Sequence, residues 1–250
     1  MRRYRNAGPQ IRWKRGAVML ALLVATLQAP VVRADGVLVF GGTGRLGSEI
    51  VGALLVADER VTVFVRPESD RRRLQGKDVR YVVGDLLDAA SVTAAFRAVR
   101  PRVAIDASAL YDRKHEPAIR NIVAGALANG SAQVIHHGSV GAGDNMKLFP
   151  AIDFTELAAI LHDKGRAEEL LIGSGLNYTI IRNGMLENDD AKSTGQARLT
   201  EDLSALGRIT RRDLAALTLQ CVDSPRCRNR VLHALDDHLD SGKRDATRLR

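Results

Sequence analysis

Four glycines recur at short spacing in one segment of the chain. The segment reads Gly41-Gly42-Thr43-Gly44-Arg45-Leu46-Gly47 and directly follows the apolar run of residues 36–40. A glycine-rich turn between a strand and a helix lets the backbone approach a pyrophosphate, which the first helix amides then bind. We expect Gly41 and Gly44 to make the turn and Gly47 to let helix and strand pack closely. The sequence therefore predicts a dinucleotide cofactor held by Gly41, Gly42, Thr43, Gly44, Arg45, Leu46 and Gly47.

A second group of residues indicates which dinucleotide is preferred. Arg66 follows the apolar run 61–65 and lies nineteen residues after Gly47, where NAD-preferring sites carry an acid that binds the ribose 2′-hydroxyl. An arginine there accommodates the 2′-phosphate, so NADP(H) is predicted in preference to NAD(H). The three arginines at 71–73 are expected on a solvated helix face. Asp85 and Leu86 are predicted to contact the adenine, although Asp85 could equally cap the next helix.

Alternating apolar patterns predict the elements that position these residues. Runs of strand length and composition cover residues 36–40, 61–65, 79–83, 103–107, 133–137 and 177–181. Between them, residues 45–56, 89–99, 116–129 and 154–174 carry apolar residues at helical spacing, with Gly130 and Gly175 where helix ends are expected. The alternation predicts an α/β fold, with a single Rossmann-like doubly wound parallel sheet and helices on both faces.

Several further motifs carry a family resemblance over residues 36 to about 222. The chain resembles the atypical short-chain dehydrogenase/reductase proteins, particularly the NmrA-like regulators and the biliverdin/flavin reductases. The resemblance rests on the glycine-rich segment, on Val65-Arg66, and on residues 84–86, 139–143, 174–184 and 209–215. Residues 182–184 read Arg-Asn-Gly where the family usually has Arg-Pro-Gly, so Asn183 is a departure on the substrate side.

The resemblance also implies where catalysis would occur. Dehydrogenases of this superfamily use Tyr-x-x-x-Lys, in which lysine and cofactor lower the tyrosine pKa for proton exchange with the substrate. Lys164 matches the lysine, but Ile160 stands at the tyrosine position and cannot transfer a proton. Ser139 matches a serine that family members present toward the nicotinamide. Ser139 and Lys164 are therefore the predicted catalytic residues, with His136, His137 and His162 as weaker candidates for a proton relay.

Two function classes fit a cofactor site without the tyrosine. The first is an NADPH-dependent reductase of a small-molecule acceptor such as a flavin or quinone, whose reduced form can take protons from water. The second, implied by the likeness to NmrA-like regulators, is a non-catalytic NADP(H)-sensing regulator or assembly factor. No metal site is predicted from the residue spacing, and the sequence does not indicate an oligomeric state.

The first 34 residues are predicted to be a targeting segment. Basic residues up to Arg15 precede the uncharged run 16–32, and Val32-Arg33-Ala34 fits a signal-peptidase site. A cleaved signal peptide and an uncleaved anchor through residues 16–32 are both open, so the body is expected to be exported or anchored, and membrane contact is expected only through this segment. If the start of the chain is wrongly assigned, the protein would be cytoplasmic.

Charge and cysteine content complete the domain picture. The net charge of +8 lies almost entirely in residues 1–34, because residues 35–250 hold 30 basic and 29 acidic residues, so no nucleic-acid partner is expected. Cys221 and Cys227 could pair across a short loop in an exported protein, or remain reduced with Cys221 buried. Residues 35–235 are predicted to form one NAD(P)-binding domain, and the charged residues 236–250 a flexible tail.

Overall fold

A largely parallel eight-stranded sheet forms the centre of the protein. The computed structural model describes residues 36–110 and 114–240, so the predicted targeting segment lies outside the described residues. The strands run in the order β3-β2-β1-β4-β5-β6-β10-β8, and all neighbours are parallel except the antiparallel pair β10 and β8. Their bounds are β1 Val37–Phe40, β2 Val61–Val65, β3 Arg80–Val83, β4 Val103–Asp106, β5 Gln133–Ser139, β6 Tyr178–Asn183, β8 Arg198–Thr200 and β10 Arg230–Leu235.

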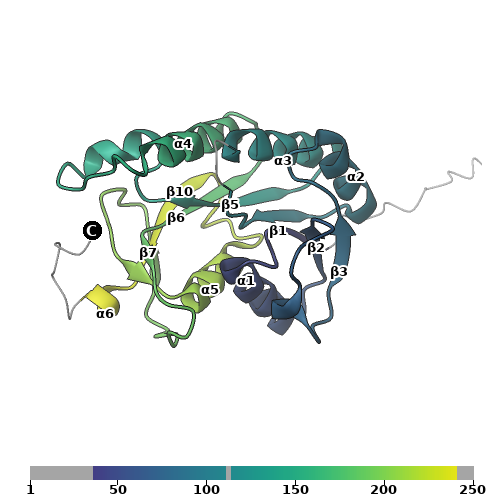
Figure 1. Ribbon diagram of the computed structural model, residues 1–250, viewed down its shortest axis with the longest axis horizontal. Coiled ribbons are helices and arrows are strands. Elements are labelled where there is room, and N and C mark those ends of the chain that lie inside the picture. The colour runs from purple at the N-terminus through teal and green to yellow at the C-terminus, as the bar shows by residue number, and fades with distance from the viewer. Residues whose placement is uncertain (1–35, 111–113, 241–250) are drawn as a thin grey trace, which may run out of the picture. The chain divides into compact units, whose positions relative to one another are not determined.

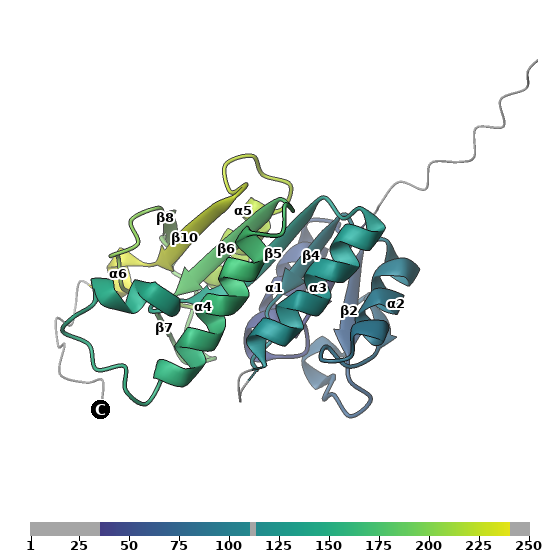
Figure 2. The same cartoon turned by 90° about the horizontal axis from the view of Figure 1, so that it is seen from above.

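Helices cover both faces of this sheet (Figures 1 and 2). One face carries α1 (Arg45–Val56) and α5 (Arg211–Cys221), and the other carries α2 (Ala89–Val99), α3 (His115–Asn129) and α4 (Ala158–Ile172). Each face has its own apolar cluster, because the continuous apolar strands present buried side chains in both directions. The predicted fold class, a Rossmann-like doubly wound sheet, is confirmed.

Some elements differ from the expectations. The helix predicted over 154–174 begins only at Ala158, and strand β10, the antiparallel β8 and a small pair formed by β7 (Met185–Leu186) and β9 (Arg208–Ile209) were not predicted. The charged tail was placed from residue 236, but Asp236 is buried and α6 (Asp237–Asp240) follows it. Residues 241–250 lie outside the described residues.

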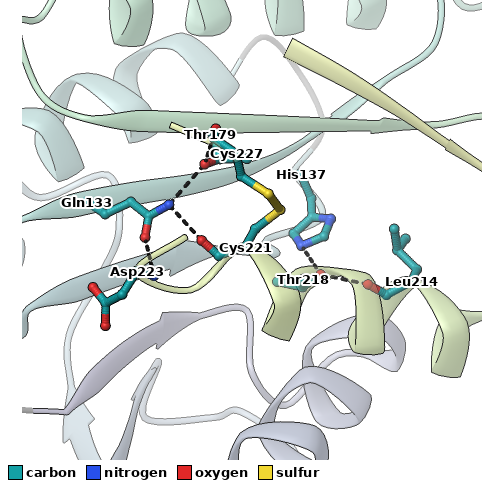
Figure 3. Close-up of a disulfide and its surroundings, with 8 residues drawn as sticks. All are labelled: Gln133, His137, Thr179, Leu214, Thr218, Cys221, Asp223 and Cys227. Atoms are coloured by element: carbon teal, nitrogen blue, oxygen red, sulfur yellow. Dashed lines mark hydrogen bonds between the residues drawn. A yellow bond between two sulfur atoms is a disulfide. The ribbon is translucent and has the colours of Figure 1, made fainter. Parts of the chain in front are cut away.

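The two cysteines form a disulfide at the end of α5 (Figure 3). The sequence left open whether they pair. Both are buried, and side chains from the sheet bind their carbonyl groups. The side-chain amide of Gln133 donates to the Cys221 carbonyl at 2.9 Å, and the hydroxyl of Thr179 donates to the Cys227 carbonyl at 2.9 Å. The disulfide and these bonds therefore fasten the loop between α5 and β10 against the sheet.

Candidate functional site

The glycine-rich segment forms a tight turn between β1 and α1. Gly41 has φ of +72°, and a Cβ at this position would lie 2.6 Å from the Ala107 carbonyl oxygen. A Cβ on Gly47 would lie 2.1 Å from the Gly41 carbonyl oxygen, so helix and turn approach as closely as predicted. Gly44 is the N-cap of α1 and has no side chain to accept from the first-turn amides. Those amides suit an anionic ligand, so the turn fits a dinucleotide pyrophosphate.

A cavity of about 1170 Å³ lies at the carboxyl ends of the parallel strands. Its walls include Phe40 at the end of β1, Val65 at the end of β2 and Asn183 at the end of β6. Ligands of doubly wound sheets bind at this edge, where the strand order reverses between β1 and β4. The volume exceeds the 300–1,000 Å³ typical of a site for one small ligand. The space is therefore large enough for an extended ligand such as a dinucleotide.

Most of the predicted site residues line this one cavity. They are Gly41, Thr43, Gly44, Arg45, Leu46, Arg66, Asp85, Leu86, Ser139 and Lys164. Gly42 and Gly47 are not part of the wall. A Cβ on Gly42 would lie 2.7 Å from the Val63 side chain, so this glycine permits close packing behind the turn.

The polar residues after β2 and β3 have separate partners. Arg66 is largely exposed, and its Nε lies 3.2 Å from Glu68 Oε1. The expected solvated arginine face is divided: Arg71 lies over the Tyr81 ring and Arg72 pairs with Asp70. Asp85 accepts a hydrogen bond from the Leu87 amide at 2.9 Å, while Asp88 is the N-cap of α2. Asp85 is therefore a wall residue of the cavity and does not cap that helix.

Lys164 lies on α4 and lines the same cavity as the glycine-rich turn. Burial lowers the pKa of its ammonium group, and the negative charges of Asp106, Glu168 and Asp163 partly offset that effect. Glu168, one turn later, forms a buried pair with Arg182 of β6, whose Nε lies 3.0 Å from Glu168 Oε2. This pair fixes the rotation of α4, so Lys164 is held toward the cavity.

A buried acid–histidine pair that was not predicted from the sequence lies beneath the cavity. Asp106 at the end of β4 accepts from the Ser108 hydroxyl at 2.6 Å, and its other oxygen lies 2.8 Å from His136 Nδ1. Burial alone would raise the pKa of Asp106, but His136 and Ser108 lower it to about 2. Ser108 lines the cavity, so this pair supports its wall. The signal that could have found Asp106 and Ser108 is their place directly at the end of a parallel strand.

The three candidate histidines occupy different surroundings. His137 lines the cavity, and its Nε2 lies 3.2 Å from the hydroxyl of Thr218, which donates to the Leu214 carbonyl (Figure 3). The hydroxyl therefore accepts from Nε2–H, and burial, with a further contribution from the neighbouring His136, lowers the His137 pKa to about 3. His136 is buried and does not line the cavity, whereas His162 is exposed and lines a separate hollow of about 510 Å³. Because its pKa is about 3, His137 is neutral at physiological pH.

Comparison with known proteins identifies the family. The sequence pattern of NAD(P)H-binding proteins matches residues 41–225, which is most of the chain. The chain belongs to this NAD(P)H-binding family. The resemblance to atypical short-chain dehydrogenase/reductase proteins is thereby confirmed, and the protein binds NAD(P)H.

Proteins that are similar to this chain carry names of different activities. The solved structure of ChuY, an anaerobillin reductase from Escherichia coli O157:H7, is 25% identical, with a TM-score of 0.71 over 80% of this chain and 96% of that one. Quinone oxidoreductase 2 of Escherichia coli K12 is 27% identical over 58% of this chain and 46% of its own length. Sterol demethylase protein B of Methylococcus capsulatus is 35% identical over 42% of this chain and 34% of its own. The chain thus spans about a third to a half of these two curated relatives.

Proposed function

We propose that the protein is an NADPH-dependent reductase of a flat, conjugated acceptor such as a quinone or a flavin. The observation that carries this proposal is one continuous cavity whose wall contains both the glycine-rich turn and the pair Ser139 and Lys164. ChuY, named as an anaerobillin reductase, and quinone oxidoreductase 2 support the same class. The preference for NADPH rests on Arg66, whose exposed pair with Glu68 is weak enough to exchange for a phosphate.

The chain's own residues would supply orientation and a proton. The nicotinamide, when bound, supplies the hydride. Ser139 at the end of β5 would hydrogen-bond an acceptor oxygen or nitrogen and orient it. Lys164 would donate one proton to the acceptor as it becomes an anion, and would take a proton back from solvent. The lowered pKa of Lys164 makes its ammonium a stronger acid than an exposed lysine, which suits this role in the absence of a tyrosine.

The proposal is tested by following NADPH absorbance with the full chain and a panel of quinones and flavins. Saturable turnover with an acceptor supports the reductase. Binding of NADPH without turnover of any acceptor would contradict it and would favour the sensing or assembly role, which the isoleucine at position 160 also fits.

Export of the protein is part of the same proposal. A basic segment followed by an apolar run precedes the domain, and the buried disulfide is of a kind that persists in oxidising compartments. Among residues 36–110 and 114–240 no helix is long and apolar enough to cross a membrane. Mass spectrometry of the mature protein tests the proposal: a terminal peptide that begins at Asp35 supports cleavage after Ala34, and an intact Met1 contradicts it.

A further inference from the structure

Three arginines from separate elements converge on a single carboxylate at the rim of the cavity. Arg45 begins α1, Arg73 lies in the short 3₁₀ helix Arg72–Leu74, and Arg211 begins α5. Their guanidinium groups approach Asp189 at 3.2 Å, 3.6 Å and 3.2 Å respectively. Arg45 and Arg211 also line the cavity, so the cluster adjoins the nucleotide site.

The charges in this cluster do not balance. In the ion pairs of the described residues, one carboxylate serves all three guanidinium groups, so Asp189 can neutralise only one of their three positive charges. Like charges at this distance repel each other, and a single Asp neutralises only part of that repulsion. A phosphate carries up to two negative charges and three acceptor oxygens, and it matches the planar fork of arginine better than one carboxylate does. The cluster is therefore better suited to a phosphate than to the carboxylate that it holds.

The segment that carries Asp189, residues 187–197 between β7 and β8, has a fixed base and an exposed tip. Asp213, near the start of α5, accepts from the Thr194 amide at 3.0 Å, from the Gly195 amide at 3.1 Å and from the Ser193 hydroxyl. Thr194 also donates to the buried Asp236. The side chain of Asp189 is 38% exposed and ends at the arginines. Release of Asp189 from the arginines would therefore leave the base of the segment in place.

We propose that Arg45, Arg73 and Arg211 form a phosphate subsite of the nucleotide cavity, and that Asp189 occupies it as an internal carboxylate in the free protein. A phosphate of the dinucleotide displaces Asp189 on binding. Asp189 thus competes with the cofactor and weakens its binding. This inference rests on the dinucleotide binding that the proposed function uses, and it adds Arg73 and Arg211 to the contacts already expected of the glycine-rich turn, Arg45 and Arg66.

The test is the affinity of the full chain for NADP⁺ and NAD⁺, measured by isothermal titration without any acceptor. Asp189→Asn keeps the side-chain size and removes the competing charge, so we expect the dissociation constant for NADP⁺ to fall about fivefold, the size expected for a few weak surface pairs. Asp190→Asn, at the neighbouring exposed position, is the matched control and should leave affinity unchanged. An unchanged or weaker affinity of Asp189→Asn would overturn the proposal.

A second variant distinguishes the 2′-phosphate of the cofactor from its pyrophosphate. Arg73→Gln should weaken binding, whereas Arg72→Gln, which removes only the exposed pair with Asp70, should not. An effect confined to NADP⁺ identifies the 2′-phosphate, and an equal effect on NAD⁺ identifies the pyrophosphate; an Arg73→Gln protein that binds as wild type overturns the subsite. Because no acceptor is present, failure of the reductase proposal leaves these results intact. A wild-type protein that binds neither nucleotide would overturn both.

Discussion

At the scale of single residues, the site combines a glycine-rich turn that fits a dinucleotide with a lysine that has no tyrosine one helical turn before it. Ile160 replaces a proton donor, while Lys164, one helical turn later, lies in the cavity with a lowered pKa. In the proposed reductase, the lysine therefore has to do more than assist a tyrosine. Its surroundings, with Glu168 fixed by Arg182, hold it in place for this role.

Lys164→Met should lower kcat for acceptor reduction by about a hundredfold, because it removes the proposed proton donor and keeps the length of the side chain. The dissociation constant for NADPH should change by much less. Stopped-flow absorbance and nucleotide titration measure the two quantities separately. Lys147→Met, at an exposed lysine paired with Asp144, is the control. A variant that loses NADPH binding but keeps kcat would show that Lys164 binds the cofactor and does not donate the proton.

Arg66→Glu should weaken binding of NADPH much more than binding of NADH, by about tenfold or more, because a carboxylate repels the 2′-phosphate and can accept from a 2′-hydroxyl. Fluorescence titration with both nucleotides gives the ratio. Arg97→Glu, on the exposed side of α2, makes the same charge change away from the cavity. An equal loss of affinity for both nucleotides would mean that Arg66 does not recognise the 2′-phosphate.

At the scale of elements, a disulfide and a hydrogen bond constrain α5. The disulfide closes the loop that follows it, and the bond between His137 and Thr218 joins its middle to β5. Arg211 and Asp213, at the amino end of the same helix, contact the segment with Asp189. The position of α5 therefore affects the rim of the nucleotide cavity.

Replacing both Cys221 and Cys227 by Ala should lower the free energy of unfolding by about 2 kcal/mol, which is the loss expected for a short closed loop. Urea unfolding measures the change. Dithiothreitol should destabilise the wild-type protein by a similar amount and should not affect the double variant. If the reductant lowers the stability of both proteins equally, the disulfide does not account for the effect.

The sequence predicted the elements whose signals are local. The glycine turn and the strands β1, β2 and β5 follow from short patterns of glycine and β-branched residues. Strand β10 was missed because it begins with an arginine and contains a histidine, and its burial depends on pairing with β6. The contact of Asp106 with His136 depends on the register of β4 against β5, and that of Asp189 with three arginines on the packing of four segments. Neither can be derived from spacing along the chain.

At the scale of the whole molecule, buried histidines make stability depend on pH. Burial, with a contribution from the neighbouring charge of Lys164, lowers the pKa of His115 to about 4, and burial with His136 lowers that of His137 to about 3. The unfolded chain binds protons at these histidines below about pH 6.5, while the folded chain does not. Stability is therefore complete above that pH and falls as the pH decreases toward the folded values. Below about pH 4, the unfolded chain also binds a proton at Asp106, whose pKa in the folded protein is about 2, so the free energy of unfolding falls further.

Between pH 8 and pH 5, each of the two histidines should account for a loss of about 2 kcal/mol in the free energy of unfolding. Urea unfolding at both values tests this with His137→Gln, which should show a smaller difference between the two pH values than the wild type. His162→Gln, at an exposed histidine, should retain the full difference. An unaltered pH dependence in His137→Gln would contradict the assignment.

The antiparallel strand β8 has a consequence for how copies of the molecule behave in solution. Without it, β10 would present the open hydrogen-bonding edge of a long, apolar sheet to other chains. Strand β8 covers that edge with only three residues, and Arg198 on it pairs with Asp237 at 2.6 Å. A strand so short and charged is a poor template for further strand addition. The segment that carries Asp189 leads into β8, so the same stretch of chain reaches the rim of the nucleotide cavity and covers the edge of β10.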